Sequence, residues 1–292
     1  MKRIVLNLTI FLCCLFSTAT FAFTSKTIDA SGIVGTYYYQ EGSKNQPAVV
    51  IWGGSDGGNF AAKYPFVMSS VIELVDSGYA VMGLSYFDYN SHSNIPDSLT
   101  NVPLEYFDKA FDWLERQPEV KKGGIAIYGT SRGAELALIL ATHVDKINVV
   151  IAGAPSSFVW GSFDQTQTPE QWMNMVKTDP CRPAWTKGGK PITNICHKQM
   201  LNVDPWYSVI DSPDNVKDSL IPVENSSAAI LITSGSKDEV WPSTRMGWQI
   251  LERLKSEQYT YPYKHIVYNT GHYVYNESWN DVLAFIKEHH TQ

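Results

Sequence analysis

The chain has 292 residues, which is enough for one large domain or two small ones. Hydrophobic residues make up 44% and charged residues 18%, a composition typical of a packed globular protein and not of a disordered, collagen-like or coiled-coil chain. The formal net charge is −6 and the sequence has no basic stripe, so we expect no nucleic-acid partner.

The first 22 residues have the order of a secretory signal peptide. Lys2 and Arg3 precede an uncharged apolar stretch over 4–16, and small residues follow it up to Ala22. The alternative is a membrane anchor, but the apolar stretch is shorter than the ~20 residues that a bilayer crossing needs. We therefore expect residues 1–22 to be removed by cleavage near Ala22, a secreted or periplasmic mature protein, and no stable membrane insertion.

From Pro47 onward, short β-rich apolar runs alternate with helical patterns, which is typical of a mostly parallel sheet with helices on both faces. The predicted strands are 48–52, 79–85, 124–128, 147–152, 228–233 and 263–268. The predicted helices are 66–76, 104–116, 134–143, 244–257 and 278–289. The expected fold class is α/β, with one doubly wound domain over residues 23–292.

Residues 156–220 interrupt this alternation. Pro, Gly and Asn are frequent there, and neither the helical nor the strand period dominates. The segment holds four of the nine tryptophans, Trp160, Trp172, Trp185 and Trp206. Because a compact domain rarely tolerates so long a plain loop, we expect a small cap insertion over the sheet.

The same segment contains the two cysteines that remain after signal cleavage, since Cys13 and Cys14 belong to the signal. In an oxidising compartment, Cys181 and Cys196 predict a disulfide that closes a local loop. Two free thiols are one alternative. A zinc site with His197 is another, although the CxxC spacing is missing. We expect no metal and no organic cofactor.

Two stretches match G-x-S-x-G, one around Ser55 and one around Ser131. A nucleophile elbow needs a strand that runs into a sharp turn and then directly into a helix. Ser131 has this context, with the strand at 124–128 before it and strong helix formers at 134–141 after it. Ser55 also follows a strand, but two glycines and Asn59 come next, which do not favour a helix start. The sequence therefore predicts Ser131 as the nucleophile.

The glycine-rich turn around Ser55 suits an oxyanion hole instead. In this architecture one N–H comes from an early loop and one from the residue after the nucleophile. We assign these donors to Gly54 and Arg132. Two alternatives stay open, namely that Ser55 supplies the loop N–H and that the turn is only structural.

A serine hydroxyl needs a base within hydrogen-bond reach and an acid that orients the base. Asp238 follows the strand at 228–233 and His272 follows the strand at 263–268, so both fall at strand ends where open parallel sheets bind ligands. The order Ser, Asp, His along the chain is the one this architecture uses. Glu239 is the near alternative for the acid.

The remaining histidines have less suitable positions, because none follows a late strand on a glycine-containing turn. They are His92, His143, His197, His265, His289 and His290. Tyr86, Phe87 and Tyr89, together with the cap aromatics, are candidates for an acyl pocket, although single aromatic residues more often belong to a core.

Five runs of sequence, within 50–58, 104–114, 129–137, 238–241 and 271–273, carry a family resemblance. They resemble the C-terminal catalytic domain of the acyl-CoA thioesterase and bile-acid-CoA:amino-acid N-acyltransferase family, over roughly 47–155 and 222–275. The resemblance implies an α/β-hydrolase fold and acyl transfer through a covalent acyl-enzyme, with Ser131, Asp238 and His272 as the triad.

The chain departs from this family in three ways. Animal members carry an N-terminal β-sandwich domain, for which the about 25 residues between the expected cleavage and the first predicted strand leave no room. The acyltransferase branch uses Cys where this chain has Ser131, which favours water as the acceptor. An exported protein is also not expected to meet coenzyme A thioesters. The resemblance therefore supports the fold and the site of this chain more firmly than it supports a substrate.

The sequence thus predicts a serine hydrolase that cleaves a small-molecule ester or thioester through an acyl-enzyme on Ser131. An alternative within enzymes is an acyl-CoA thioesterase, or an acyltransferase to an amine acceptor. An alternative of another class is a non-catalytic ligand-binding member of the fold. The presence of all three triad residue types in order argues against that last reading.

Overall fold

The structure is a computed structural model that describes residues 23–30, 32–92, 94–201, 205–211 and 216–290. The predicted signal peptide, with Cys13 and Cys14, lies outside the described residues. Within the described ranges, no helix combines the length and the apolar character that a bilayer crossing requires.

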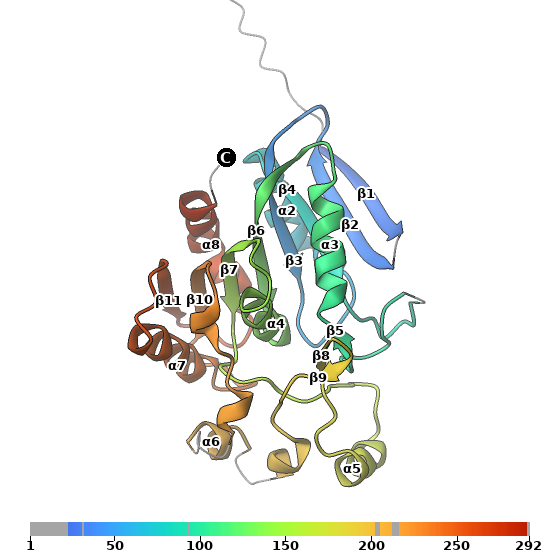
Figure 1. The fold of residues 1–292 in the computed structure, drawn as a ribbon, viewed down its shortest axis with the longest axis vertical. Helices are drawn as coiled ribbons and strands as arrows, with labels where there is room; N and C mark the ends of the chain where they lie inside the picture. Colours follow the sequence, from blue (N-terminus) through green and yellow to red (C-terminus); the bar gives the residue numbers. More distant parts are fainter. Residues whose placement is uncertain (1–22, 31, 93, 202–204, 212–215, 291–292) are drawn as a thin grey trace, which may run out of the picture.

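One eight-stranded sheet forms the centre of the molecule (Figure 1). Its strands are β1 (Phe23–Ala30), β2 (Ile33–Gln40), β3 (Gln46–Trp52), β4 (Ala80–Ser85), β6 (Val120–Thr130), β7 (Ile147–Gly153), β10 (Ala229–Gly235) and β11 (Tyr263–Tyr268). The spatial order is β1-β2-β4-β3-β6-β7-β10-β11. The neighbouring strands β4, β3, β6, β7, β10 and β11 are parallel to one another, and β2 is antiparallel to both of its neighbours, β1 and β4.

Helices cover both faces of this sheet. They are α1 (Phe60–Lys63), α2 (Pro65–Asp76), α3 (Glu105–Glu115), α4 (Arg132–Ala141), α7 (Ser243–Ser256) and α8 (Tyr275–His289). Alternate strand residues face two separate cores, since Val50 and Ile127 pack with α3, α4 and α7, whereas Val49 and Ala126 pack with α1, α2 and α8. Strands buried on both faces read as unbroken apolar runs, which is why the sequence revealed them.

The six predicted strands and five predicted helices are all present, with ends that differ by a few residues. The sequence analysis missed the hairpin of β1 and β2, whose alternating polar residues and edge position give a weak strand signal. It also missed α1, which begins only at Phe60 and is capped by the Asn59 side chain. The α/β-hydrolase architecture expected from the sequence is confirmed.

The described residues of 156–220, called the cap segment below, lie at one end of the sheet. Their helices and strands include α5 (Pro169–Thr178), β8 (Trp185–Lys187), β9 (Lys190–Pro191) and α6 (Pro205–Ile210). Figure 1 shows these elements below the sheet, at the end opposite the C-terminus. β8 also pairs with β5 (Val102–Pro103), which joins the cap segment to the loop before α3. A disulfide joins Cys181 to Cys196, in agreement with the predicted pairing.

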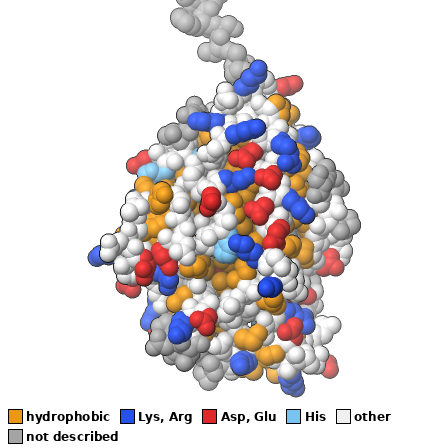
Figure 2. All heavy atoms as spheres, viewed as in Figure 1, with side chains coloured by type: hydrophobic (Ala, Val, Ile, Leu, Met, Phe, Trp, Pro, Cys, Tyr) orange, Lys and Arg blue, Asp and Glu red, His pale blue; other side chains and the backbone are white. Residues whose placement is uncertain are grey.

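The face drawn in Figure 2 has basic and acidic side chains interspersed over its whole extent. This face therefore lacks the continuous basic field with which a protein attracts a nucleic-acid backbone. The arrangement agrees with the mixed charge composition of the sequence.

Candidate active site

Ser131 lies at the sharp turn between β6 and α4. Its backbone has φ 55° and ψ −123°, a left-handed conformation that a residue with a side chain rarely adopts. Such a strained strand-to-helix turn presents a hydroxyl at the end of the sheet, as a nucleophile elbow does. The Ser131 N–H is held by the carbonyl oxygen of Gly153 on the neighbouring strand β7, at 2.8 Å.

Both glycines that flank Ser131 in the motif are required by close packing. A Cβ on Gly129 would lie 2.0 Å from the carbonyl oxygen of Gly133, and one on Gly133 would lie 2.1 Å from that of Gly53. The indole of Trp52 donates to the Gly133 carbonyl oxygen at 2.8 Å and holds the turn from the adjacent strand. The elbow therefore packs directly against the glycine-rich loop after β3.

Gly54 of that loop touches Ser131, since a Cβ at Gly54 would come within 2.9 Å of the Ser131 Cβ. The Tyr86 hydroxyl lies 2.9 Å from the Gly53 carbonyl oxygen and 3.1 Å from that of Gly54, and donates its one proton between them. The Tyr89 hydroxyl donates to the Ser55 carbonyl oxygen at 3.0 Å. These phenols fix the carbonyl groups of the loop and thereby the direction of its N–H groups.

Tyr86 and Phe87 are buried in the core beneath this loop. They therefore occupy the core position that the sequence analysis gave as commoner for single aromatic residues, and they do not line an acyl pocket. Arg132, the other predicted oxyanion donor, is the first residue of α4, where a backbone N–H has no partner within its own helix. The structure thus places both predicted donors beside Ser131.

His272 and Asp238 lie in direct contact. The Nδ1 atom of His272 is 2.9 Å from Oδ2 and 3.0 Å from Oδ1 of Asp238, and the two side chains are 5% and 2% exposed. Asp238 also accepts the backbone N–H groups of Val240 and Trp241 and the hydroxyl of Ser243. Burial alone would raise the pKa of Asp238, but the His272 contact and these hydrogen bonds outweigh it and lower the pKa.

Glu239, the alternative acid, has a different place. Its side chain is exposed, and its Oε2 accepts the backbone N–H of His272 at 3.2 Å. The carboxylate at the imidazole is therefore Asp238. Both ring contacts of Asp238 go to Nδ1, which leaves Nε2 of His272 as the ring nitrogen available to a reacting group.

Ser131 and His272 line one cavity of about 410 Å³, together with Gly54 and Ser55. This cavity, called the sheet-side cavity below, brings the predicted nucleophile, base and oxyanion loop to one place. Ser55 belongs to the same cavity wall, but α1 starts five residues after it and so the turn at Ser55 is no strand-to-helix elbow.

The other described histidines have structural partners or lie apart from Ser131. Burial lowers the pKa values of His197, His265 and His290 to about 4. His265 contacts the Ser234 hydroxyl at 2.7 Å, and His290 contacts the Ala48 carbonyl oxygen at 2.9 Å. In the described part of the chain, no group of three or more His, Cys, Asp or Glu side chains is arranged to hold a metal ion.

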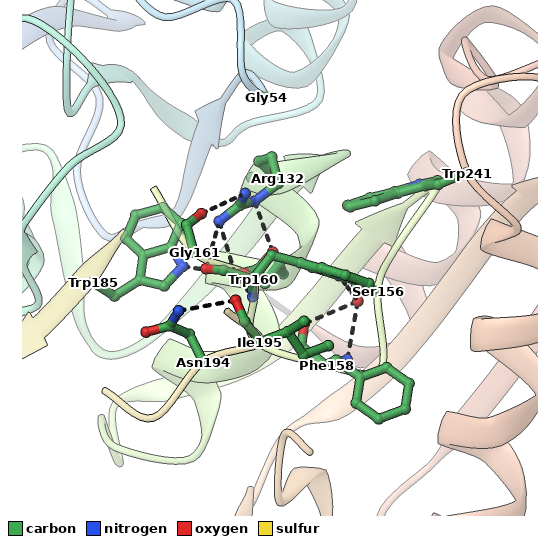
Figure 3. A network of polar contacts seen from close by, with 12 residues as sticks. Gly54, Arg132, Ser156, Phe158, Trp160, Gly161, Trp185, Asn194, Ile195 and Trp241 are labelled. Atoms are coloured by element: carbon green, nitrogen blue, oxygen red, sulfur yellow. Dashed lines mark hydrogen bonds and ion pairs between the residues drawn. The ribbon is translucent and has the colours of Figure 1, made fainter. Parts of the chain in front are cut away.

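A buried ion pair behind the elbow was not found by the sequence analysis (Figure 3). Glu135, with no exposed surface, forms an ion pair with Arg132 at 2.8 Å from Nε. It accepts hydrogen bonds from Arg132 Nη2 at 3.3 Å, from the Trp185 indole at 2.7 Å and from the Trp160 N–H at 3.2 Å. The other guanidinium nitrogens of Arg132 donate to the carbonyl oxygens of Trp160 and Gly161, both at 3.0 Å. We call these contacts the elbow–cap clamp, because they join the first turn of α4 to two separate parts of the cap segment.

The spacing of Arg132 and Glu135 was the only sequence signal for this clamp, since residues three apart on a helix are neighbours. That signal did not show that the pair is buried. Trp185 lies 50 positions further along the chain, and no local pattern connects it to Glu135.

Comparisons with known proteins identify relatives and structural neighbours. An alignment with mouse acyl-coenzyme A thioesterase 2, mitochondrial, has 31% identity over 69% of this chain and 40% of that protein. Human acyl-coenzyme A thioesterase 1 is 30% identical over 69% of the chain and 44% of its own length. The chain thus matches less than half the length of these relatives.

Solved structures show the same fold. A putative dienelactone hydrolase from Klebsiella pneumoniae superposes with a TM-score of 0.58 at 14% identity, over 91% of this chain and 99% of that one. A Pyrococcus furiosus esterase gives 0.54 at 18% identity, over 99% and 97%. Residues 102–277 match the family described as "BAAT / Acyl-CoA thioester hydrolase C terminal", a range that contains Ser131, Asp238 and His272. The chain belongs to this family of α/β hydrolases.

Proposed function

We propose that this protein is a serine hydrolase that cleaves an ester or thioester through an acyl-enzyme on Ser131. The observation that carries the proposal is the strained elbow at Ser131, in one cavity with an imidazole that Asp238 holds at Nδ1. The family membership and the names of the relatives support acyl-transfer chemistry on this fold.

In this mechanism the Ser131 Oγ attacks the carbonyl carbon while His272 Nε2 takes its proton. The N–H groups of Gly54 and Arg132 stabilise the oxyanion, and each such donor typically contributes ~3 kcal/mol to the transition state. When the tetrahedral intermediate collapses, His272 returns the proton to the leaving alcohol or thiol. Water then attacks the acyl-enzyme by the same route, which releases the carboxylic acid and restores the Ser131 hydroxyl.

Asp238 orients the imidazole and stabilises its charged form while it holds the proton. We propose water as the acceptor, since the nucleophile is Ser. We also propose that the mature protein is exported and begins after Ala22. The disulfide in the cap segment supports this, because such bonds persist in oxidising compartments.

The first test is labelling of the purified protein with a fluorophosphonate probe, with hydrolysis of short p-nitrophenyl esters measured in parallel. We expect Ser131→Ala to lose labelling and to reduce kcat by about 10⁴-fold or more. Ser55→Ala is the matched control and should keep the label.

Labelling that persists in Ser131→Ala and disappears in Ser55→Ala would overturn the assignment of the nucleophile. A folded wild-type protein that neither takes the probe nor hydrolyses any ester or thioester would favour the non-catalytic reading. Circular dichroism of each variant shows that a lost label does not come from unfolding.

A further inference from the structure

Two cavities meet at Ser131. The sheet-side cavity of about 410 Å³ was described above, and a second cavity of about 330 Å³ opens toward the cap segment. Ser55, Ser131 and Val240 line both of them. Under the proposed function, on which this inference rests, a carbonyl carbon at Ser131 therefore has one arm of the substrate in each cavity. Both volumes fall in the ~300–1,000 Å³ range of small-molecule sites.

The sheet-side cavity is walled by aromatic rings. Phe60 contacts Tyr64 and Tyr275 edge to face, with ring centroids 5.4 and 5.8 Å apart, and Phe66 and Tyr273 complete the ring-lined wall. Edge-to-face packing fixes all of these rings except Tyr273, which is 80% exposed, and the packed rings present an apolar surface with few polar atoms.

The second cavity, called the cap-side cavity, is walled mainly by indoles. Trp160, Trp172, Trp206 and Trp241 all line it. Trp206 packs perpendicular to Trp160 at 4.9 Å and to Trp241 at 6.0 Å. A neutral apolar or aromatic group gains from burial against such rings, at ~25 cal/mol for each Å² of apolar surface removed from water.

The charged groups that line the two cavities favour an uncharged substrate. Within the described residues they are the carboxylates Asp56 and Asp164 and the guanidinium of Arg132. Arg132 is already paired with Glu135 and with two carbonyl oxygens in the elbow–cap clamp. Asp56 faces Lys63 in an exposed pair at 3.3 Å, and such pairs attract weakly in water. His197 is held neutral near pH 7, because burial lowers its pKa to about 4.

An anionic substrate group in either cavity would thus meet carboxylates and aromatic walls while its solvation is lost. Like charges repel more strongly in a partly desolvated site than in water, and a buried anion needs a partner. We infer that the substrate is an uncharged carboxylic ester or thioester with an apolar or aromatic group on each side of the carbonyl. A carboxylate on a chain short enough to lie inside either cavity fits this site poorly.

The test compares two p-nitrophenyl esters whose acyl chains have the same number of carbons. p-Nitrophenyl hexanoate is neutral, whereas mono-p-nitrophenyl adipate carries a carboxylate at the far end of its acyl chain. We expect kcat/KM to be about tenfold or more higher for the neutral ester, since each tenfold reflects only ~1.4 kcal/mol of unfavourable interaction. Equal values, or a preference for the charged ester, would overturn the inference and leave the proposed hydrolase intact. Absence of hydrolysis for both, and for neutral thioesters, would instead refute the proposed function.

Variants of the two cavity carboxylates test whether the cavity lining causes the discrimination against a charged substrate. Asp56→Asn and Asp164→Asn should each raise the ratio of kcat/KM for the charged ester to that for the neutral ester, by about threefold or more. Asp76→Asn removes an exposed carboxylate at the end of α2, away from both cavities, and is the matched control. If Asp76→Asn raises the ratio as much as the two cavity variants do, overall charge and not the cavity lining discriminates, and the inference fails.

Discussion

Asp238 illustrates how a single side chain acquires its environment from the fold. It sits in a turn after β10, where backbone N–H groups of that turn and the hydroxyl of Ser243, the first residue of α7, hold its oxygens toward His272. Burial disfavours its charge, yet these contacts more than compensate, so the pKa is lowered. The sequence favoured Asp238 as the acid but left Glu239 open as the alternative, because the two are adjacent at the same strand end. The turn geometry separates them, since only Asp238 reaches the ring.

We predict that Asp238→Asn lowers kcat by about 10⁴-fold for a short p-nitrophenyl ester, because the amide favours the wrong imidazole tautomer. Glu239→Gln, which alters only a contact to the His272 backbone, should lower kcat by less than about tenfold. A similar loss in both variants would contradict the role assigned to Asp238.

Asp238 also predicts a pH dependence of stability. Its folded pKa is lowered, so ionised Asp238 stabilises the fold fully above its unfolded pKa of ~3.9, and this contribution is lost as the pH falls through the folded pKa. The difference in unfolding free energy between wild type and Asp238→Asn should therefore shrink between pH 5 and pH 2, as measured by urea titration. A difference that stays constant over this range would argue against the lowered pKa.

At the scale of elements, the elbow–cap clamp shows how α4 is tied to the cap segment. Glu135 is fully buried, and burial raises its pKa against the lowering effects of Arg132, Trp185 and Trp160. Burying this pair is thus costly by itself, and losing one partner leaves an uncompensated charge. The clamp holds Trp160, which is a wall of the cap-side cavity.

We predict that Glu135→Gln lowers the free energy of unfolding by about 3–5 kcal/mol, because it leaves the Arg132 guanidinium without its carboxylate. Glu115→Gln is the matched control, since Glu115 pairs with Lys146 at 2.9 Å near the surface and should cost less than about 1 kcal/mol. Urea unfolding at neutral pH measures both. Equal losses in the two variants would contradict a special role for the buried pair.

The helices and strands with strong local sequence patterns were the ones that the sequence analysis predicted. The central strands are apolar throughout, and α3 has an apolar face with the helical period, so the sequence revealed both. α5 also carried a signal that was passed over, since Thr168 and Gln171 form a capping box and Pro169 starts the helix. The hairpin of β1 and β2 gave only a weak signal, and its place in the sheet is set by the pairing of β2 with β4.

At the scale of the whole molecule, the cap segment is built from short pieces with little regular structure. The Cys181–Cys196 bond joins two parts of the cap segment to each other, and the pairing of β8 with β5 fastens the segment to the rest of the chain. Apolar contacts of Trp160 and Ile195 with Trp241 and Met246 add a third core, which joins the cap segment to α7 and the loop before it. The cap-side cavity thus lies between the cap segment and the residues around Ser131.

We predict that the double variant Cys181→Ser, Cys196→Ser loses ~3 kcal/mol of stability, as the chain-entropy account gives for a loop of about fifteen residues. Thermal unfolding with and without dithiothreitol measures this. The reductant should lower the Tm of the wild type and leave that of the variant unchanged. A wild-type Tm that does not respond to reduction would show that the bond does not stabilise the fold.

The sequence by itself determined the order of strands and helices, the elbow around Ser131 and the chain order of Ser131, Asp238 and His272. These features depend on local patterns, since apolar periodicity and turn-forming glycines act within a few residues. Only the tertiary structure decided that Asp238 and not Glu239 contacts the imidazole, that Tyr86 supports the oxyanion loop, and that Trp185 reaches Glu135. Such contacts join residues far apart in the chain, and their partners are chosen by how the sheet and the cap segment pack, which no local pattern records.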